Sequence, residues 1–426
     1  MAQLDRYFEI VVARKASDLH LTSGTVPMMR VHGKMQPVEA GHAPLRREDV
    51  ERMLLEIAPE ANRKEFLEEN DTDFAHEFRS VARFRANIFR DRTGPGGVFR
   101  QIPREIISAE KLGLPKAVLE LCHLSKGLVV VTGPTGSGKS TTLCAMVDYI
   151  NRTRDEHIIT IEDPIEFVHE NKRCLINQRE IGPHTVSFKR ALRAALREDP
   201  NVIVVGEMRD LETVAIALEM AETGHLVFGT LHTTTAASTV DRIIDQFPPE
   251  QQAQIRVMLA DSLRGVIAQT LIPKKDGSGR VAALETLIVT SSVAANIREG
   301  KTHQIPLAMQ TGRKLGMCEL NVALVQLVQQ GLVAPADALA KAVDKAGLAR
   351  ELERLGIAPE AAVEAAPAAV APAPAPRTPA TPKATTEPRS DALPRRPRAT
   401  SARLRRPPLE GTPKPAASPK SSWFGS

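Results

Sequence analysis

A glycine-rich run between an apolar strand and a helical segment places the strongest constraint on how this chain can fold. Residues 133–140 read Gly-Pro-Thr-Gly-Ser-Gly-Lys-Ser and directly follow the apolar residues 128–132. They match the phosphate-binding loop G-x-x-x-x-G-K-[ST] in both sequence and context. In such a loop, backbone N–H groups and the start of the next helix surround an anion. The sequence therefore predicts a nucleotide site built on a strand-loop-helix unit.

Each position of this loop has an expected task. Lys139 is predicted to reach the β and γ phosphates of ATP, and the Ser140 hydroxyl to ligate Mg²⁺. The residues expected to enclose the nucleotide are Gly133, Pro134, Thr135, Gly136, Ser137, Gly138, Lys139, Ser140 and Thr141. Because proteins with unrelated tasks share this loop, the motif alone does not identify the function.

The part of the chain before the loop is typical of a small α+β domain. Residues 1–105 mix short strand-like runs with two helical stretches, near residues 4–15 and 47–69. Residues 106–125 are expected to form a linker to the next domain.

The part that follows predicts an α/β domain. From residue 126 to about 272, apolar strands alternate with amphipathic helices, which is the pattern of a parallel sheet. The turn-rich residues 273–279 are predicted to form a hairpin loop, and the chain is then mainly helical up to residue 357.

The remaining residues, 358–426, form a tail rich in Pro, Ala and Arg. From residue 359 onward it holds 15 of the 31 prolines and 11 Lys and Arg against 5 Asp and Glu. Since the whole chain carries a net charge of +5, the body before the tail is close to neutral. We expect the tail to be disordered. Its arginine clusters could contact anionic surfaces, and Trp423 with Phe424 could dock a partner, although a solvated linker is the simpler interpretation.

The sequence also excludes several classes of protein. No apolar run approaches the roughly 18 residues that a membrane-spanning helix needs. The four cysteines lie far apart and form no C-x-x-C pair, so no zinc site or disulfide framework is expected. Reduced thiols in a cytoplasmic protein are the predicted state.

Two acidic segments follow predicted strands. Residues 200–207 read Pro-Asn-Val-Ile-Val-Val-Gly-Glu, so Glu207 stands where proteins with this loop place a carboxylate that supports Mg²⁺. Residues 162–166 read Glu-Asp-Pro-Ile-Glu after the strand-like residues 157–161. Carboxylates at the carboxyl edge of a parallel sheet can orient and deprotonate a water molecule. Glu162 and Glu166 are both candidates for this base.

Five segments together resemble the secretion and type IV pilus ATPases, and most of all the members that retract pili in twitching motility. They are residues 132–142, 161–167, 194–200, 206–210 and 221–233. The resemblance covers about residues 3–350 and includes Ala16-Ser-Asp-Leu-His20. It implies a PAS-like N-terminal domain, a RecA-like ATPase domain and a ring-shaped homohexamer that binds ATP between domains.

The resemblance also implies roles for individual residues. Glu166 would be the catalytic base, with Glu162 beside it, and Glu207 would hold Mg²⁺. His225 and His232 match the family's His box, which is expected to sense the nucleotide. The N-terminal domain would supply arginines to ATP from three positions, Arg83, Arg85 and Arg100.

Other features bear on which branch of the family the chain resembles. The short N-terminal domain and the absence of a four-cysteine zinc element favour retraction over pilus extension. Residues 292–299 depart from the pattern, however. They read Ser-Val-Ala-Ala-Asn-Ile-Arg-Glu, where retraction members carry A-I-R-N-L-I-R-E, so Ala294 and Ala295 replace Arg and Asn.

The predicted function is therefore an ATP-driven hexameric motor that retracts a type IV pilus from the cytoplasmic face of the inner membrane, where an inner-membrane platform protein is the expected partner. One alternative is a pilus or secretion paralogue with an accessory or assembly role. Another is a nucleic-acid-dependent translocase that uses the basic tail, which the near-neutral body disfavours. A third is a regulatory scaffold that binds ATP without turnover.

Overall fold

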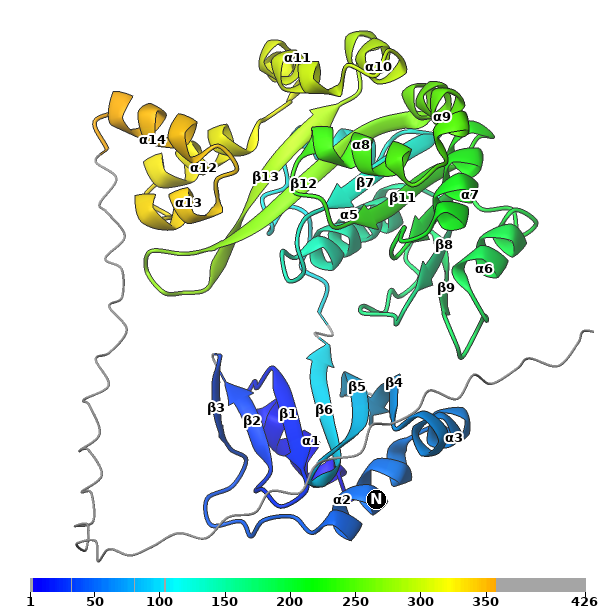
Figure 1. Ribbon diagram of the computed structural model, residues 1–426, viewed down its shortest axis with the longest axis vertical. Helices are drawn as coiled ribbons and strands as arrows, with labels where there is room; N and C mark the ends of the chain where they lie inside the picture. The colour runs from blue at the N-terminus through cyan, green and yellow to red at the C-terminus, as the bar shows by residue number, and fades with distance from the viewer. Residues whose placement is uncertain (1–2, 32, 80, 103–104, 358–426) are drawn as a thin grey trace, which may run out of the picture. The chain divides into compact units, whose positions relative to one another are not determined.

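The computed structural model describes residues 3–31, 33–79, 81–102 and 105–357 (Figure 1). The expected fold class is confirmed. An N-terminal domain with an antiparallel sheet is followed by an α/β domain with a mostly parallel sheet and by a group of C-terminal helices. The predicted tail, residues 358–426, lies outside the described residues.

The N-terminal domain is built on a six-stranded sheet in the order β3-β2-β1-β6-β5-β4, in which neighbouring strands run antiparallel. Its core contains Phe8, whose ring stacks 4.4 Å from that of Phe84 and meets Phe99 edge-on. The elements are α1 Asp5–Ala13, β1 Asp18–Thr22, β2 Met28–Val31, β3 Lys34–Pro37, α2 Arg47–Ile57, α3 Glu60–Glu69, β4 Asp71–Phe78, β5 Ala82–Asp91 and β6 Gly94–Ile102.

The predicted helical stretch at residues 47–69 is two helices and not one. Helix α2 ends at Ile57, and α3 begins at Glu60. Between them Ala58 has an extended backbone with ψ of 134°. This break follows from Pro59, because proline lacks an N–H and disfavours the helical conformation in the residue before it.

The second domain contains a seven-stranded sheet in the order β13-β12-β7-β11-β10-β8-β9. All neighbouring strands run parallel except β12 and β13, which form the predicted hairpin across residues 273–279. The strands are β7 Gly127–Thr132, β8 His157–Glu162, β9 Leu175–Glu180, β10 Val202–Val205, β11 Leu226–Leu231, β12 Leu263–Pro273 and β13 Arg280–Ile288.

Helices cover both faces of this sheet and continue beyond it. Those that precede β12 are α4 Lys116–Leu121, α5 Lys139–Thr153, α6 Phe188–Ala195, α7 Leu211–Glu222, α8 Ala236–Asp245 and α9 Pro249–Ser262. Those that follow β13 are α10 Ser291–Arg298, α11 Ile305–Thr311, α12 Leu320–Gln329, α13 Pro335–Lys341 and α14 Lys345–Arg354, with short 3-10 turns at Thr302–Gln304 and Gly312–Leu315.

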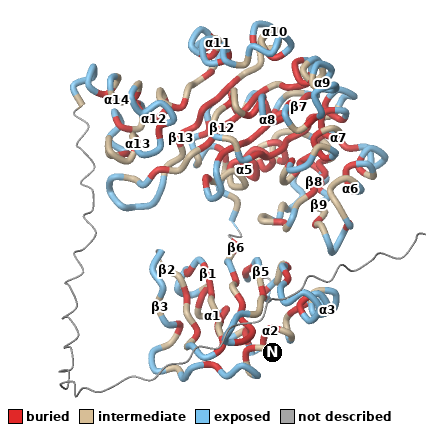
Figure 2. Tube along the Cα trace, in the orientation of Figure 1, coloured by how far each residue is buried: buried red, intermediate tan, exposed pale blue. Residues whose placement is uncertain are grey.

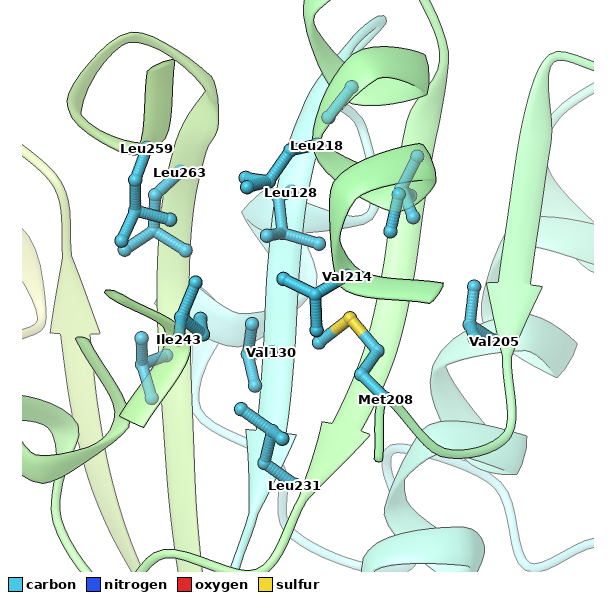
Figure 3. Packing of buried hydrophobic residues seen from close by; sticks show 14 of the residues in the cluster. Leu128, Val130, Val205, Met208, Val214, Leu218, Leu231, Ile243, Leu259 and Leu263 are labelled. Carbon is cyan, nitrogen blue, oxygen red and sulfur yellow. The ribbon is translucent and has the colours of Figure 1, made fainter. Parts of the chain in front are cut away.

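The continuous apolar run of β7 is explained by burial on both faces. Leu128 and Val130 point into the core formed with α7, α8 and α9 (Figure 3). Val129 and Val131 belong to a second core formed with α4 and α5. A strand that alternates between two covered faces needs apolar residues at every position. Figure 2 accordingly shows the central strands as buried and the outer helix surfaces as exposed.

The segment predicted as a linker, residues 106–125, contains α4 and packs with the second domain. Five of its residues belong to the core that α5 closes: Ala109, Leu114, Val118, Leu121 and Cys122.

A buried carboxylate joins the sheet to two helices. Glu285 on β13 is only 7% exposed. Its Oε1 accepts from the Ala236 N–H at the start of α8 (2.6 Å), and its Oε2 accepts from the Leu320 N–H at the start of α12 (3.1 Å). Burial raises the pKa of Glu285 despite these two donors. The first N–H groups of a helix lack partners within the helix, so this one side chain supplies acceptors for two helix starts.

We expect Glu285→Ala to lower the free energy of unfolding by about 2–4 kcal/mol, because each buried N–H left without an acceptor costs about 1–3 kcal/mol. Urea denaturation of the full chain, followed by far-UV circular dichroism, measures this change. The exposed Glu222→Ala is the control and should change stability by less than about 0.5 kcal/mol. Equal stability of both variants would refute the structural role of Glu285.

Candidate nucleotide site

A cavity of about 270 Å³ lies at the carboxyl edge of the parallel sheet, where β7, β8, β10 and β11 all end. Ligands bind at this edge in open α/β sheets. Its wall gathers segments that the sequence indicated separately. The lining includes Thr135, Gly136, Lys139, Ser140, Glu162, Asp163, Glu166, Gly206, Glu207, Arg209 and His232.

The glycine-rich loop has the backbone that its sequence predicts. Gly136 and Gly138 have φ of 76° and 88°, in the left-handed region that favours glycine. Helix α5 begins at Lys139, directly after the loop. The Lys139 ammonium donates to the Gly133 carbonyl at 2.8 Å, so it lies folded over the loop. Burial lowers the pKa of Lys139, and the nearby charges of Glu207 and Glu166 oppose that shift.

His232 bridges the loop lysine and an acid of the cavity. Its Nδ1 lies 3.3 Å from Lys139 Nζ, and its Nε2 lies 2.7 Å from Glu207 Oε1. An ammonium can only donate and a carboxylate can only accept, so Nδ1 is the acceptor and Nε2 carries the proton. His232 thus links Lys139 to Glu207 through two hydrogen bonds.

The second predicted histidine lies elsewhere. His225 precedes β11, and His232 follows it, so the strand Leu226–Leu231 separates them by about 20 Å. The Nδ1 of His225 contacts the Met220 carbonyl at the end of α7. Within one chain the structure therefore brings His232 to the cavity and does not bring His225 there.

Glu207 is an anion held by two donors. It ends the turn after β10 and accepts from Arg209 Nε at 2.6 Å and from His232. Burial raises the pKa of Glu207, but hydrogen bonds from Arg209 and His232 outweigh it and leave the pKa below its ordinary value. Arg209 was not among the candidate residues, although it stands in the motif at 206–210 and its spacing of two from Glu207 could have indicated it.

The two candidate bases differ in their surroundings. Glu162 ends β8, and its Oε1 accepts from Thr160 Oγ1 at 2.6 Å and from Gln178 Nε2 at 3.1 Å. Burial raises the pKa of Glu162 in spite of these hydrogen bonds. Glu166 lies four residues further on, in the cavity wall, and makes no such side-chain contact among the described residues. Glu166 is thus the acid whose oxygens remain open to a ligand.

The three predicted arginines have different partners. Arg85 lines the cavity, and its Nε lies 3.8 Å from Asp73 Oδ1. Arg83 Nη2 donates to Glu180 Oε2 at 2.6 Å, and Arg100 Nε donates to Asp18 Oδ1 at 3.0 Å. Only Arg85 is therefore part of the cavity wall, although all three project from one face of the sheet, where Arg85 is paired opposite Arg100.

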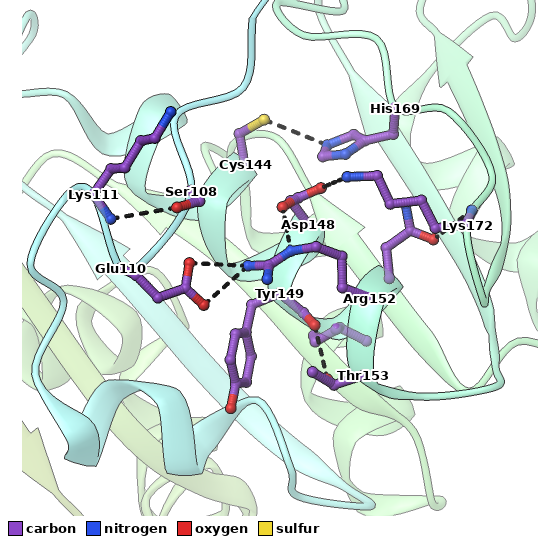
Figure 4. Close-up of polar contacts among 12 residues, drawn as sticks. Ser108, Glu110, Lys111, Cys144, Asp148, Tyr149, Arg152, Thr153, His169 and Lys172 are labelled. Carbon is purple, nitrogen blue, oxygen red and sulfur yellow. Dashed lines mark hydrogen bonds and ion pairs between the residues drawn. The ribbon is translucent and has the colours of Figure 1, made fainter.

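Polar contacts on the outer side of α5 fix the helix that carries Lys139 and Ser140 (Figure 4). The buried Asp148 accepts from Arg152 Nε at 2.8 Å and from Lys172 Nζ at 2.5 Å. Arg152 in turn donates to both carboxylate oxygens of Glu110 at 3.1 Å. These ion pairs attach the segment before α4 and the loop after β8 to the same helix.

Cys144 also lines the cavity, and its thiol lies beside His169. Its sulfur lies 3.5 Å from His169 Nε2. Burial raises the pKa of Cys144 above its ordinary value, and burial lowers the pKa of His169 to about 4. The pair is therefore a neutral thiol beside a neutral imidazole, which does not provide the thiolate that nucleophilic chemistry needs.

The described residues offer neither a clustered metal site nor a membrane-spanning helix. They contain no group of three or more His, Cys, Asp and Glu side chains placed to hold a metal ion. Nor does any helix within residues 3–357, as far as they are described, combine the length and apolar character needed to cross a bilayer.

The family model described as "Type II/IV secretion system protein" matches residues 3–346. The chain belongs to this family. It is 53% identical over 327 residues to the type IV pilus retraction ATPase PilT of Pseudomonas aeruginosa, which covers 77% of this chain and 94% of that protein. The type IV pilus ATPase PilU of the same organism is 39% identical over 354 residues, covering 83% of this chain and 92% of PilU.

A solved structure agrees with the sequence relationship. The crystal structure of the pilus retraction motor PilT with bound ADP superposes with a TM-score of 0.76 and 48% identity, covering 83% of this chain and 99% of that one. The chain is thus a homologue of the pilus retraction ATPases, and the predicted family is confirmed.

The different positions of the two histidines give a direct test of the site. His232→Ala removes the bridge between Lys139 and Glu207, so kcat for ATP hydrolysis should fall about tenfold, because a hydrogen bond to a charged group contributes about 1.5–3 kcal/mol. His225→Ala is the matched control, for which kcat within about twofold of the parent is expected. Steady-state ATPase assays measure both. A larger loss in His225→Ala than in His232→Ala would contradict the assignment.

Proposed function

We propose that this chain hydrolyses ATP to power retraction of a type IV pilus. The observation that carries the proposal is the cavity itself, because the phosphate-binding loop, the acids after β8 and β10, and His232 meet at one edge of the sheet. The proposal is supported by 53% identity to a pilus retraction ATPase and by the ADP bound in the related PilT structure.

The loop residues would hold the nucleotide. The loop and the start of α5 line the cavity, and backbone N–H groups at such a loop and helix start suit phosphate oxygens. Lys139 would leave the Gly133 carbonyl and reach the β and γ phosphates. The 15-residue α5 adds a favourable field for the anion at its N-terminus.

Mg²⁺ fits the side chains at the same place. Ser140 and Glu207 both line the cavity and offer a hydroxyl and a carboxylate oxygen, which are hard ligands of the kind that Mg²⁺ prefers. The low pKa of Glu207 keeps its carboxylate charged. When bound, the ion would neutralise charge on the phosphate oxygens.

We assign the role of general base to Glu166. Its carboxylate would orient a water molecule toward the γ phosphorus and accept the proton that this water loses. Glu162 suits a supporting role better, because Thr160 and Gln178 already occupy one of its oxygens. Arg85, which lies in the cavity wall, would neutralise charge on the phosphates.

The assembly proposed here is a homohexameric ring at the cytoplasmic face of the inner membrane, where it would act on an inner-membrane platform protein. The family resemblance supports this assembly, and the similar proteins are described as a pilus retraction ATPase and a pilus retraction motor. Mass measurement in solution with bound nucleotide tests the ring.

Helix α10 bears on what the motor moves. Three residues anchor the helix: Val293 and Ile297 are fully buried, and Arg298 donates to Asp261 of α9 at 2.9 Å. Of these, Ile297 and Arg298 match the retraction motif. Ala294 and Ala295, which replace Arg and Asn of the motif, are only partly buried. The chain thus keeps the helix in place and changes the surface that it presents. This observation favours a modified or accessory role in retraction as the second candidate function.

Glu166→Gln should lower kcat at least about 100-fold and leave the affinity for ADP within about threefold, because an amide keeps the shape but cannot accept the proton. Glu170→Gln, an exposed acid four residues on, is the control and should hydrolyse ATP normally. In the source organism, replacement of the gene by the Glu166→Gln form should abolish twitching and leave excess surface pili. Normal twitching with this variant would overturn the proposed function.

Restoring the Arg and Asn of the motif in the double variant Ala294→Arg with Ala295→Asn should change the retraction rate and leave basal ATP hydrolysis within about twofold, since α10 lies outside the cavity. Pilus retraction can be followed with optical tweezers or micropillar arrays. A parallel fall in both quantities would place α10 within the catalytic machinery.

A further inference from the structure

A glutamine that belongs to none of the sequence motifs forms hydrogen bonds to the nucleotide loop and to the helix that follows it. Gln269 lies on β12, the strand beside β7, and only 5% of its surface is exposed. Its Nε2 donates to the Ser137 carbonyl at 2.7 Å, and its Oε1 accepts from Thr142 Oγ1 at 2.6 Å. Thr142 is itself 2% exposed. Both ends of one buried amide are therefore used, one on the loop and one on the first turn of α5.

The chemistry of the two partners requires an amide here. The Ser137 carbonyl can only accept, so it must face the NH₂ group of Gln269. The oxygen then faces the Thr142 hydroxyl, which can donate. A carboxylate at this position would lack the donor for Ser137, and an apolar side chain would leave both groups buried without partners.

Two glycines of the loop, Gly133 and Gly138, lie too close to Gln269 to carry a side chain without a shift. A Cβ at Gly138 would lie 2.8 Å from Gln269 Nε2, and one at Gly133 would lie 2.3 Å from the Gln269 carbonyl oxygen. Both distances are too short for a real side chain. At Gly133 the obstacle is the backbone of β12, so the close approach of this strand requires glycine there. At Gly138 the obstacle is the end of the Gln269 side chain, and the positive φ of 88° also favours glycine.

We propose that Gln269 is a positioning residue for the nucleotide, and this inference rests on the nucleotide binding proposed above. Its two hydrogen bonds bracket Lys139 and Ser140, which lie between Ser137 and Thr142 in the chain. By fixing the loop exit against the first turn of α5, Gln269 holds the backbone that carries these two residues in place before the nucleotide arrives. A site that is already ordered loses less entropy on binding, so its affinity is higher.

The test is the substitution Gln269→Met, which keeps the length of the side chain and removes both hydrogen bonds. We expect the Kd for ADP, measured by isothermal titration calorimetry on the full chain, to rise about tenfold, while kcat at saturating ATP changes less than about threefold. A loss of affinity with kcat retained distinguishes positioning from general damage to the fold. Gln246→Met is the matched control, since the amide of Gln246 has no hydrogen-bond partner among the described residues.

Two further variants keep the inference testable if Gln269→Met folds poorly. Gln269→Glu retains the acceptor for Thr142 and puts a carboxylate beside the loop, so it should raise the Kd for ADP more than tenfold. Thr142→Val removes one of the two contacts and should raise it about threefold. Combining Thr142→Val with Gln269→Met should add little to the effect of Gln269→Met alone, because both act through one interaction.

The outcomes separate this inference from the proposed function. If the parent protein binds ADP and the Gln269→Met and Thr142→Val variants bind it within twofold of the parent, the positioning role is overturned and the proposed function stands. The same conclusion follows if kcat falls while the Kd stays constant. If the parent protein binds no ADP, both proposals fail.

Discussion

The pairing of β7 with β11 on one side and β12 on the other is the interaction on which the rest of the second domain depends. All six residues of β7 are buried, and the strand is hydrogen-bonded along both edges. Such a strand cannot shift without exposing apolar surface and breaking two ladders at once. The loop that leaves its carboxyl end therefore starts from a fixed point. Because the neighbouring strands run parallel, their carboxyl ends supply the acids and the histidine at the same edge.

The hairpin of β12 and β13 pairs with β7 and contacts two further parts of the domain. Through Gln269 on β12 it contacts the loop and the first turn of α5. On β13, Glu285 faces Ala268 across the hairpin and accepts hydrogen bonds from the starts of α8 and α12. Helix α8 follows directly after the segment of His232, and α12 is the first of the last three described helices, α12 to α14. One hairpin thus connects the nucleotide loop, the histidine segment and the helices that lie furthest along the chain.

Local patterns predicted the parts of the structure that local forces determine. The loop at 133–140, the apolar strands of the parallel sheet and the hairpin at 273–279 each have a short signal, and the acids after β8 and β10 could be placed because parallel strands end at one edge. Long-range packing determined the rest. The sequence could not separate His225 from His232, since one motif contains both and only the intervening strand moves them apart. Likewise, Arg83, Arg85 and Arg100 share a face, but their partners Glu180, Asp73 and Asp18 lie in other segments. Gln269 has no local signal at all, because its partners lie more than 120 residues away.

The pattern of replacement in α10 follows from the same division between buried and exposed positions. Val293 and Ile297 lie in the core that β7 shares with α7, α8 and α9, so changing them would remove buried apolar contacts from the domain that holds the nucleotide. Ala294 and Ala295 are less constrained, since both are only partly buried, although Ala294 also packs against this core. Substitution at these two positions can therefore alter what the helix contacts and leave the nucleotide site as it is. Because neither position lines the cavity, this surface of α10 can change while the nucleotide site stays constant.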